Sequence, residues 1–141
     1  MLPYRAKGSD MSRNQRGVSL SSFFAVVVLA LLLVAGLVVD GGAQAVAGRR
    51  AELVASAAAR AAADDTAAAR LAGRQPDVAA AIIAAQRVLT GSGDVSGDVR
   101  LVSGRVRVTT TSGADTVFLS LIGIRRLSAH GSAEAELTSN R

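Results

Sequence analysis

Side chains that could carry out chemistry are few and scattered in this sequence. His130 is the single histidine and the chain has no cysteine, so neither a thiolate site nor a histidine cluster can form for a transition metal. Asp64 and Asp65 are neighbours, so on a helix they point to different sides and cannot converge as a catalytic carboxylate pair. Glu134 and Glu136 share one face of a predicted strand, but no nucleophile accompanies them. We therefore expect a protein without enzymatic activity and without a metal or cofactor.

The net charge of +5 is densest at the N-terminus. Residues 1–17 hold four basic residues and one acidic residue, a net +3, whereas residues 18–141 hold twelve arginines and ten acidic residues, a net +2. A nucleic-acid-binding domain would carry its basic residues on one folded face. The sequence also lacks a Gly-rich phosphate-binding loop. We expect neither nucleic acid nor a small-molecule substrate as a partner.

The longest apolar stretch covers residues 18–39, which contain no charged residue. It begins at Val18, ends at Val39 and is built mostly of Val, Leu and Ala, with Phe23 and Leu31 among its larger side chains. A helix of 22 residues is about 33 Å long, enough for a hydrocarbon layer of about 30 Å. A buried core helix is the competing interpretation, but 141 residues could hardly cover a helix that is apolar on every side. The segment therefore predicts a transmembrane helix in contact with membrane lipid.

The charges that flank this segment predict its orientation. Basic flanks stay on the cytoplasmic side, so residues 1–17 are expected to form a cytoplasmic basic tail, disordered over residues 1–16. Residues 40–141 then form the extracytoplasmic domain of a single-pass protein of the cell membrane. A cleaved signal peptide is the alternative, because Ala43-Gln44-Ala45 offers small residues at a suitable spacing. The apolar region of a signal peptide usually runs about 7–15 residues, which is shorter than this segment, so we expect an uncleaved anchor.

Small residues recur every four positions at the start of the apolar segment. Gly17, Ser21 and Ala25 would lie on one face of a helix, where small side chains let two membrane helices approach closely. This face is a candidate helix-packing surface, although chance accounts for the pattern at least as well in an Ala-rich chain.

Helical propensity continues beyond the membrane segment. Residues 43–71 are mostly Ala with Arg, Glu and Leu, which predicts one long helix, or two collinear helices separated at Gly41-Gly42. Gly73 is expected to end this part, and Pro76 to begin a second helix over residues 76–90. The expected buried face of the second helix consists of Val78, Ile82, Ala85 and Leu89.

The apolar period changes to two after residue 93. Residues 99–102 and 105–109 alternate apolar and polar side chains on either side of Ser103-Gly104, which predicts a hairpin with a two-residue loop. The resulting register pairs Val99 with Val108, Arg100 with Arg107, Leu101 with Val106 and Val102 with Arg105. The pairing of two arginines is mildly unfavourable unless solvent or an acidic partner screens them.

The last part of the chain contains a predicted turn, an apolar run and a long strand. Ser112-Gly113 indicates a turn, and the apolar run at residues 116–124 is too short to span a membrane and fits either a buried strand or a short helix. Residues 127–137 alternate small apolar with polar side chains, which predicts a strand whose small-residue face suits an Ala-rich helix. The predicted fold class is therefore α+β: a single N-terminal transmembrane helix extended by an Ala-rich helix, then a short helix and a small antiparallel sheet.

Several short stretches resemble one protein family. They flank the apolar segment on both sides, follow it in the Ala-rich part and recur in the 116–123 run. The positions concerned are Arg16-Gly17, Asp40, Arg49, Leu53, Phe118 and Gly123. Over residues 16–137 this pattern resembles the TadE/TadG-like proteins of Flp pilus assembly, with a pilin-like fold.

The resemblance implies a non-enzymatic, pilin-like or pseudopilin membrane protein that takes part in the assembly or secretion of a Flp (tight adherence, type IVb) pilus. Its implied partners are other pilus-assembly or pilin-like membrane proteins. Family members processed as prepilins carry Glu five residues after the cleavage-site Gly, and counted from Gly17 that place is taken by Ser22. The missing carboxylate favours an uncleaved, TadG-like anchor. The competing hypothesis is a generic single-pass accessory or binding module of the cell envelope or of a secretion apparatus.

Overall fold

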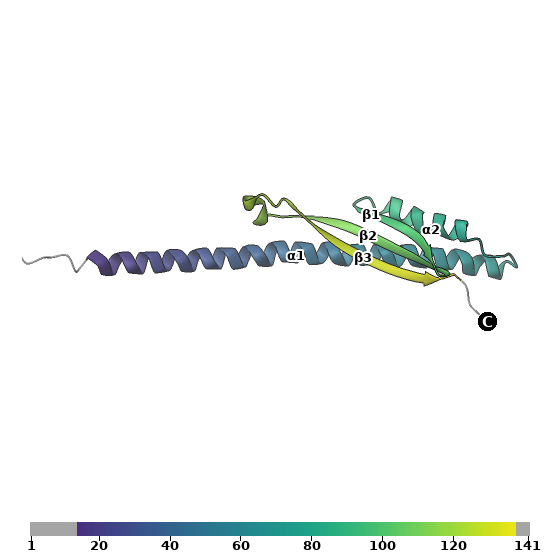
Figure 1. Cartoon of the computed structure of the whole chain (residues 1–141), viewed down its shortest axis with the longest axis horizontal. Helices are drawn as coiled ribbons and strands as arrows, with labels where there is room; N and C mark the ends of the chain where they lie inside the picture. Colours follow the sequence, from purple (N-terminus) through teal and green to yellow (C-terminus); the bar gives the residue numbers. More distant parts are fainter. Residues whose placement is uncertain (1–13, 138–141) are drawn as a thin grey trace, which may run out of the picture. The chain divides into compact units, whose positions relative to one another are not determined.

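The structure is a computed structural model that describes residues 14–137, with side chains from Leu20 onward. The fold class is α+β, as expected (Figure 1). The chain divides into two compact units between Leu37 and Val38. The elements in chain order are α1 (Asn14–Leu71), α2 (Val78–Gly91), β1 (Val95–Val102), β2 (Arg105–Asp115), the 3₁₀ helix η1 (Leu119–Ile122) and β3 (Arg126–Glu136).

α1 includes both the apolar segment and the Ala-rich segment. Gly41 and Gly42 are helical, so the two segments form one helix. Because α1 begins at Asn14, the expectation of a disordered stretch over residues 1–16 is wrong for residues 14–16. Once a helix exists, extending it by one residue is far easier than starting a new one, and Gln and Arg are good helix formers. Residues 1–13 lie outside the described part of the chain.

The ends of the helices are set by a glycine and by an aspartate. Gly73 has φ +69° and its N–H donates to the Arg70 carbonyl oxygen at 3.0 Å, which confirms that it ends α1. α2 begins at Val78, two residues later than predicted, because the Asp77 carboxylate accepts from the Ala79 N–H at 2.9 Å and caps the helix there. Val78 is exposed and Ile82 half-buried, so the predicted face is only partly correct. The buried residues of α2 are Ala81, Ala85 and Leu89.

The three strands form an antiparallel sheet in the order β1-β2-β3. The predicted hairpin register is confirmed at all four pairs from Val99↔Val108 to Val102↔Arg105. Ser103 and Gly104 both have positive φ, 51° and 78°, as a two-residue hairpin loop that matches the strand twist requires. The turn predicted at Ser112-Gly113 is wrong, since both residues lie inside β2 and pair with Ala129 and Ser128 of β3.

The core of the 38–141 unit is built largely of alanine. One cluster joins α1, α2 and the inner face of the sheet, so both helices pack against the same side of the sheet. Its buried members are Ala55, Ala58, Ala59 and Ala62 of α1, Ala81, Ala85 and Leu89 of α2, Val106 and Val108 of β2, and Leu137.

A row of residues across the sheet explains how closely the helices approach. Thr110 of β2 pairs with Gly97 of β1 and Gly131 of β3. A Cβ atom at Gly97 would lie 3.0 Å from Leu89 of α2, and one at Gly131 would lie 2.5 Å from the backbone carbon of Ala51 of α1. The Thr110 hydroxyl donates to the Ala51 carbonyl oxygen at 2.8 Å. Gly131 therefore lets the backbone of α1 contact β3 directly, which confirms the expected match between small-residue strand and Ala-rich helix, and Gly97 leaves space for the Leu89 side chain of α2.

The outer face of the sheet is polar, and it supplies acidic partners for the two paired arginines. Arg107 donates to the Glu134 carboxylate at 2.6 Å, and Arg100 donates to the Asp98 carboxylate at 2.5 Å. Each arginine of the predicted Arg100–Arg107 pair thus has its own acidic partner, which offsets the repulsion between them.

Candidate functional site

The apolar segment of α1 is exposed along its described length. Phe23 is 62% exposed, Leu31 64% and Val39 48%. Val18 precedes Leu20, the first residue whose side chain the structure describes. A core helix of this length would be mostly buried, whereas only 6% of the most apolar 18-residue stretch of α1 is buried. Within the described residues α1 is the one helix that is long and apolar enough to span a membrane.

The small-residue face predicted from Gly17, Ser21 and Ala25 lies on this helix. Ser21 and Ala25 are at the surface of α1, and Gly17 is helical but precedes the described side chains. The use of this face in helix packing stays a prediction.

Asp40, the first charged residue after the apolar segment, binds a loop that is distant in sequence. Its carboxylate accepts from the backbone N–H groups of Val117 at 2.8 Å, Phe118 at 3.4 Å and Leu119 at 2.7 Å. These N–H groups form the start of η1, which has no side-chain cap of its own. Asp40 is 1% exposed, so it supplies from α1 the buried acceptor that the start of η1 needs.

The environment of Asp40 acts on its pKa in two opposite directions. Burial raises the pKa of the carboxyl group, whereas the N–H donors of Val117, Leu119 and Phe118 lower it. The hydrogen bonds outweigh burial, so the pKa of Asp40 lies below its ordinary value and the carboxylate is charged at neutral pH.

The loop at residues 116–124 is closed by its own hydrogen bonds. The Thr116 N–H donates to the Arg125 carbonyl oxygen at 3.1 Å, and the Thr116 hydroxyl donates to the Ile124 carbonyl oxygen. Gly123, at φ +92°, ends η1 and lets the Ile124 N–H donate to the Leu119 carbonyl oxygen at 3.0 Å. Of the two predicted forms, the short helix is observed and the buried strand is not. Phe118 and Leu119 are half-buried, whereas the other large apolar side chains of this loop are exposed: Val117, Leu121, Ile122 and Ile124.

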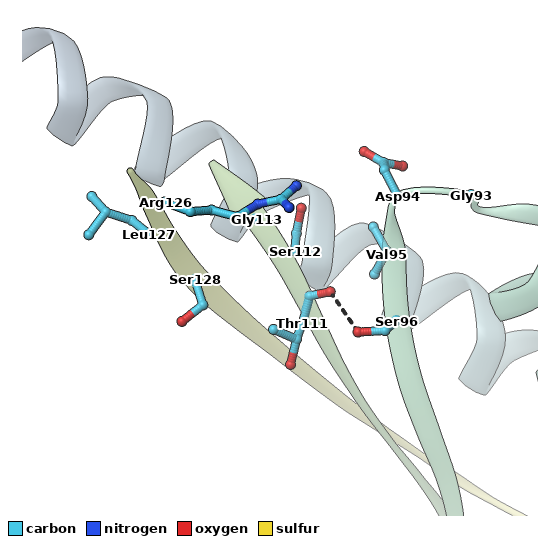
Figure 2. A pocket seen from close by; sticks show the side chains of 10 residues that line it. All are labelled: Gly93, Asp94, Val95, Ser96, Thr111, Ser112, Gly113, Arg126, Leu127 and Ser128. Atoms are coloured by element: carbon cyan, nitrogen blue, oxygen red, sulfur yellow. Dashed lines mark hydrogen bonds between the residues drawn. The ribbon is translucent and has the colours of Figure 1, made fainter. Parts of the chain in front are cut away.

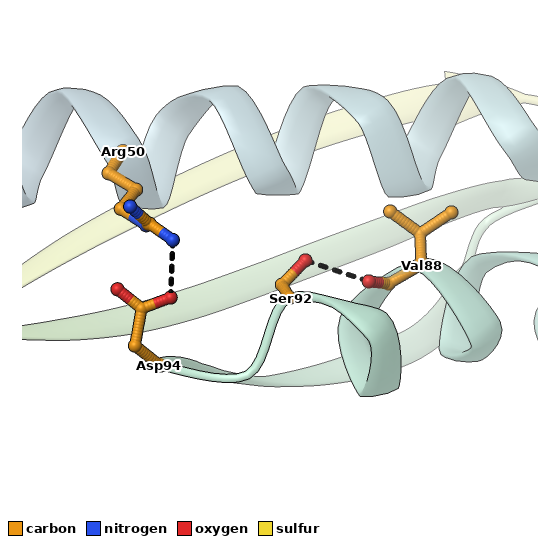
Figure 3. Close-up of polar contacts among 4 residues, drawn as sticks. All are labelled: Arg50, Val88, Ser92 and Asp94. Atoms are coloured by element: carbon orange, nitrogen blue, oxygen red, sulfur yellow. Dashed lines mark hydrogen bonds and ion pairs between the residues drawn. The ribbon is translucent and has the colours of Figure 1, made fainter.

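The other positions that carry the family resemblance lie at the surface. Arg49 is exposed and Leu53 is 65% exposed, both on α1, and Phe118 is half-buried at the start of η1. Next to Arg49, Arg50 forms an ion pair with Asp94 at 2.7 Å, which joins α1 to the residue before β1 (Figure 3). Sequence reasoning missed this pair, because its members are 44 residues apart and no local pattern connects them.

Near this ion pair, Ser92 closes the end of α2. Its hydroxyl donates to the Val88 carbonyl oxygen at 2.7 Å (Figure 3). Its backbone N–H donates to the Leu89 carbonyl oxygen at 3.1 Å. These bonds satisfy carbonyl groups at the helix end and fix the turn that leads into β1.

A shallow hollow of about 470 Å³ lies where β1 and β3 begin and β2 nears its end (Figure 2). The Arg126 side chain crosses Gly113, where any Cβ atom would overlap it, so this glycine makes room for the arginine. Arg126 has Asp115 at 3.6 Å, and Asp94 is held by Arg50. Because the charged groups of the hollow are already paired, we assign it no ligand.

His130, Glu134 and Glu136 do not converge on a common site. His130 is exposed on the outer face of β3, with its Nδ1 atom 3.1 Å from the Thr111 hydroxyl. Glu134 forms an ion pair with Arg107, and Glu136 lies two residues after Glu134 on β3. Over residues 14–137 no three His, Asp or Glu side chains gather closely enough to hold a metal ion.

Comparison of the chain with protein-family models, with curated proteins and with solved structures gives no match.

Proposed function

We propose that this chain is a non-enzymatic, pilin-like single-pass membrane protein of the TadE/TadG kind, which takes part in the assembly or secretion of a Flp (type IVb) pilus. The observation that carries the proposal is α1 itself. Its N-terminal part is apolar and exposed, while its later part buries an alanine face under a three-stranded sheet. A helix divided in this way can place one end in lipid and use the other to support a small extracytoplasmic domain.

A stripe of exposed apolar residues on α1 supports an assembly role. Val39, Val46 and Leu53 follow one another at intervals of seven residues and are 48%, 70% and 65% exposed. Side chains at this spacing lie on one side of a helix and are typical of a helix–helix contact. Since the sheet packs on a different side of α1, this stripe is available to a helix of another subunit.

The proposal places residues 1–17 in the cytoplasm and residues 40–141 outside the membrane. The basic residues before the apolar segment support this orientation. Ser22, at the place where prepilins carry Glu, supports an uncleaved anchor that stays in the membrane.

The proposal is tested by deleting the gene and counting surface filaments by electron microscopy. Filaments should be lost and should return with the wild-type gene. A Val46→Ser, Leu53→Ser double variant should restore few or none at an unchanged membrane level, because it removes the apolar stripe without touching the core. Ile83→Ser is the matched control, since Ile83 is also apolar and 47% exposed but lies on α2. Normal filaments in the deletion strain would refute the pilus role and favour a generic envelope accessory.

A further inference from the structure

The loop at residues 116–124 presents large apolar side chains to its surroundings. Val117 is 61% exposed, Leu121 82%, Ile122 73% and Ile124 43%. An ordered, hydrogen-bonded loop that exposes four such side chains within eight residues is unusual for a surface in contact with water alone. The polar outer face of the sheet shows no comparable patch among the described residues.

The exposure follows from how Asp40 holds the loop. The carboxylate draws the N–H groups of residues 117–119 toward α1. The backbone of the loop therefore occupies the contact with the helix, and the side chains of Leu121 and Ile122 are left outside it. Neither of the two buried clusters of the described residues includes these side chains.

The position of Asp40 sets the level of the loop along α1. Val39 is the last residue of the uncharged segment, so the water-facing end of a membrane span lies at Asp40. A loop bonded directly to Asp40 lies at the same level, where headgroups meet acyl chains. This step rests on the proposed function, because it requires α1 to span the bilayer.

The charges beside the loop fit the same surface. Arg125 is exposed and directly follows the apolar residues. Arg126 lies next to it and has Asp115 at 3.6 Å, with both side chains largely exposed. Aliphatic side chains followed by arginines are typical of segments that insert shallowly among anionic lipid headgroups.

We propose that the 117–124 loop is an interfacial membrane contact: Val117, Leu121, Ile122 and Ile124 enter the headgroup–acyl boundary of the outer leaflet beside α1, and Arg125 meets anionic headgroups. Asp40 is the positioning residue that holds the loop at this depth. The loop gives the extracytoplasmic domain a second attachment to the bilayer. A lipid surface suits this patch better than a protein pocket, because the side chains are aliphatic, lie at the tip of a loop and adjoin the end of a membrane segment.

The absence of cysteine from the sequence permits a direct test with the full chain. A polarity-sensitive fluorophore would be attached to a single cysteine in each of three variants, Leu121→Cys, Leu31→Cys and Ile83→Cys. Each labelled chain would be reconstituted in vesicles of phosphatidylcholine and phosphatidylglycerol. Lipids spin-labelled at a shallow or a deep acyl position would quench the fluorophores. We expect the Leu121 label to shift to shorter wavelength and to be quenched most by the shallow spin label. The Leu31 label should be quenched most by the deep one, and the Ile83 label by neither.

The three labels separate the possible failures. If the Leu31 label is quenched and the Leu121 label is in water, the inference of an interfacial contact is wrong and the membrane anchor remains supported. A Leu121 label that is blue-shifted but not quenched by lipid would show a protein partner or a second copy at the loop, which also overturns the inference. A Leu31 label that escapes quenching would remove the membrane anchor, and the inference with it. Adding Asp40→Ala to the Leu121→Cys variant should weaken the shallow quenching, since the loop would lose its position.

Discussion

Replacing Gly131 by Ala should destabilise the 38–141 unit strongly, although it adds only one methyl group. The added Cβ atom would lie 2.5 Å from both the Ala51 backbone carbon and the Glu52 nitrogen, and 2.7 Å from the Ala51 oxygen. All three atoms belong to the backbone of α1, so no side-chain rotation can relieve the overlap. The helix and the sheet must separate by roughly 1 Å to restore ordinary van der Waals distances.

Two contributions set the size of the effect. Overpacking of a closely packed core costs about 1–3 kcal/mol. The separation also stretches the 2.8 Å hydrogen bond from the Thr110 hydroxyl to the Ala51 carbonyl oxygen, a loss of about 1 kcal/mol. The free energy of unfolding should therefore fall by about 2–4 kcal/mol, which lowers the Tm of a unit of this size by about 10–25 °C.

The assay is thermal unfolding of the full chain in a mild detergent, followed by far-ultraviolet circular dichroism. Gly48→Ala is the matched control, because its Cβ atom would meet only Ala129 at an ordinary 3.7 Å. There the helix propensity of Ala should raise stability by about 0.5–1 kcal/mol. If Gly131→Ala melted at the wild-type temperature, the close approach of β3 to α1 would be wrong.

Three further predictions concern the ends of the sheet and its polar face. Asp40→Asn should lower the Tm at neutral pH. Because the pKa of Asp40 is lowered, the stabilisation by its carboxylate is present above about pH 4 and is lost as the pH falls through the lowered pKa. A series of Tm measurements against pH should show this loss in the wild type and not in the variant. Ser103→Asn should raise stability by a few tenths of a kcal/mol, because Asn tolerates the positive φ of the loop better than Ser, and a fall in Tm would contradict the observed turn. Glu134→Gln should lower the free energy of unfolding by less than about 1 kcal/mol at low salt and by nothing measurable at high salt, because the ion pair of Glu134 with Arg107 is about half exposed. An effect that does not depend on salt would mean a different role for Glu134.

The hairpin could be predicted from the sequence because its signals are local. Alternating side chains fix which residues face inward, and Ser103-Gly104 fixes the point at which the chain reverses. The turn predicted at Ser112-Gly113 failed for a related reason. Gly113 pairs with Ser128 of β3 and lies beneath the Arg126 side chain, and a single sequence does not show these neighbours on another strand.

The loop at residues 116–124 could not be predicted, because its partner is distant. Local apolarity suggests burial, whereas Asp40, 77 residues before Val117, binds the backbone and leaves the side chains outside. The sequence marks Asp40 only as the first charged residue after the apolar segment and as a position of the family resemblance. Its role as an acceptor depends on a contact that composition and periodicity do not encode. The same holds for the Arg50–Asp94 ion pair.

The central prediction is that residues 18–39 lie in a lipid bilayer. Alkaline carbonate extraction of cell membranes tests this directly, because it releases peripheral proteins and leaves membrane-spanning ones in the pellet. We predict that the full-length chain stays in the pellet and is released only by detergent. Recovery of the full-length chain in the carbonate supernatant, or in the soluble fraction before extraction, would contradict the membrane anchor and the functions proposed from it.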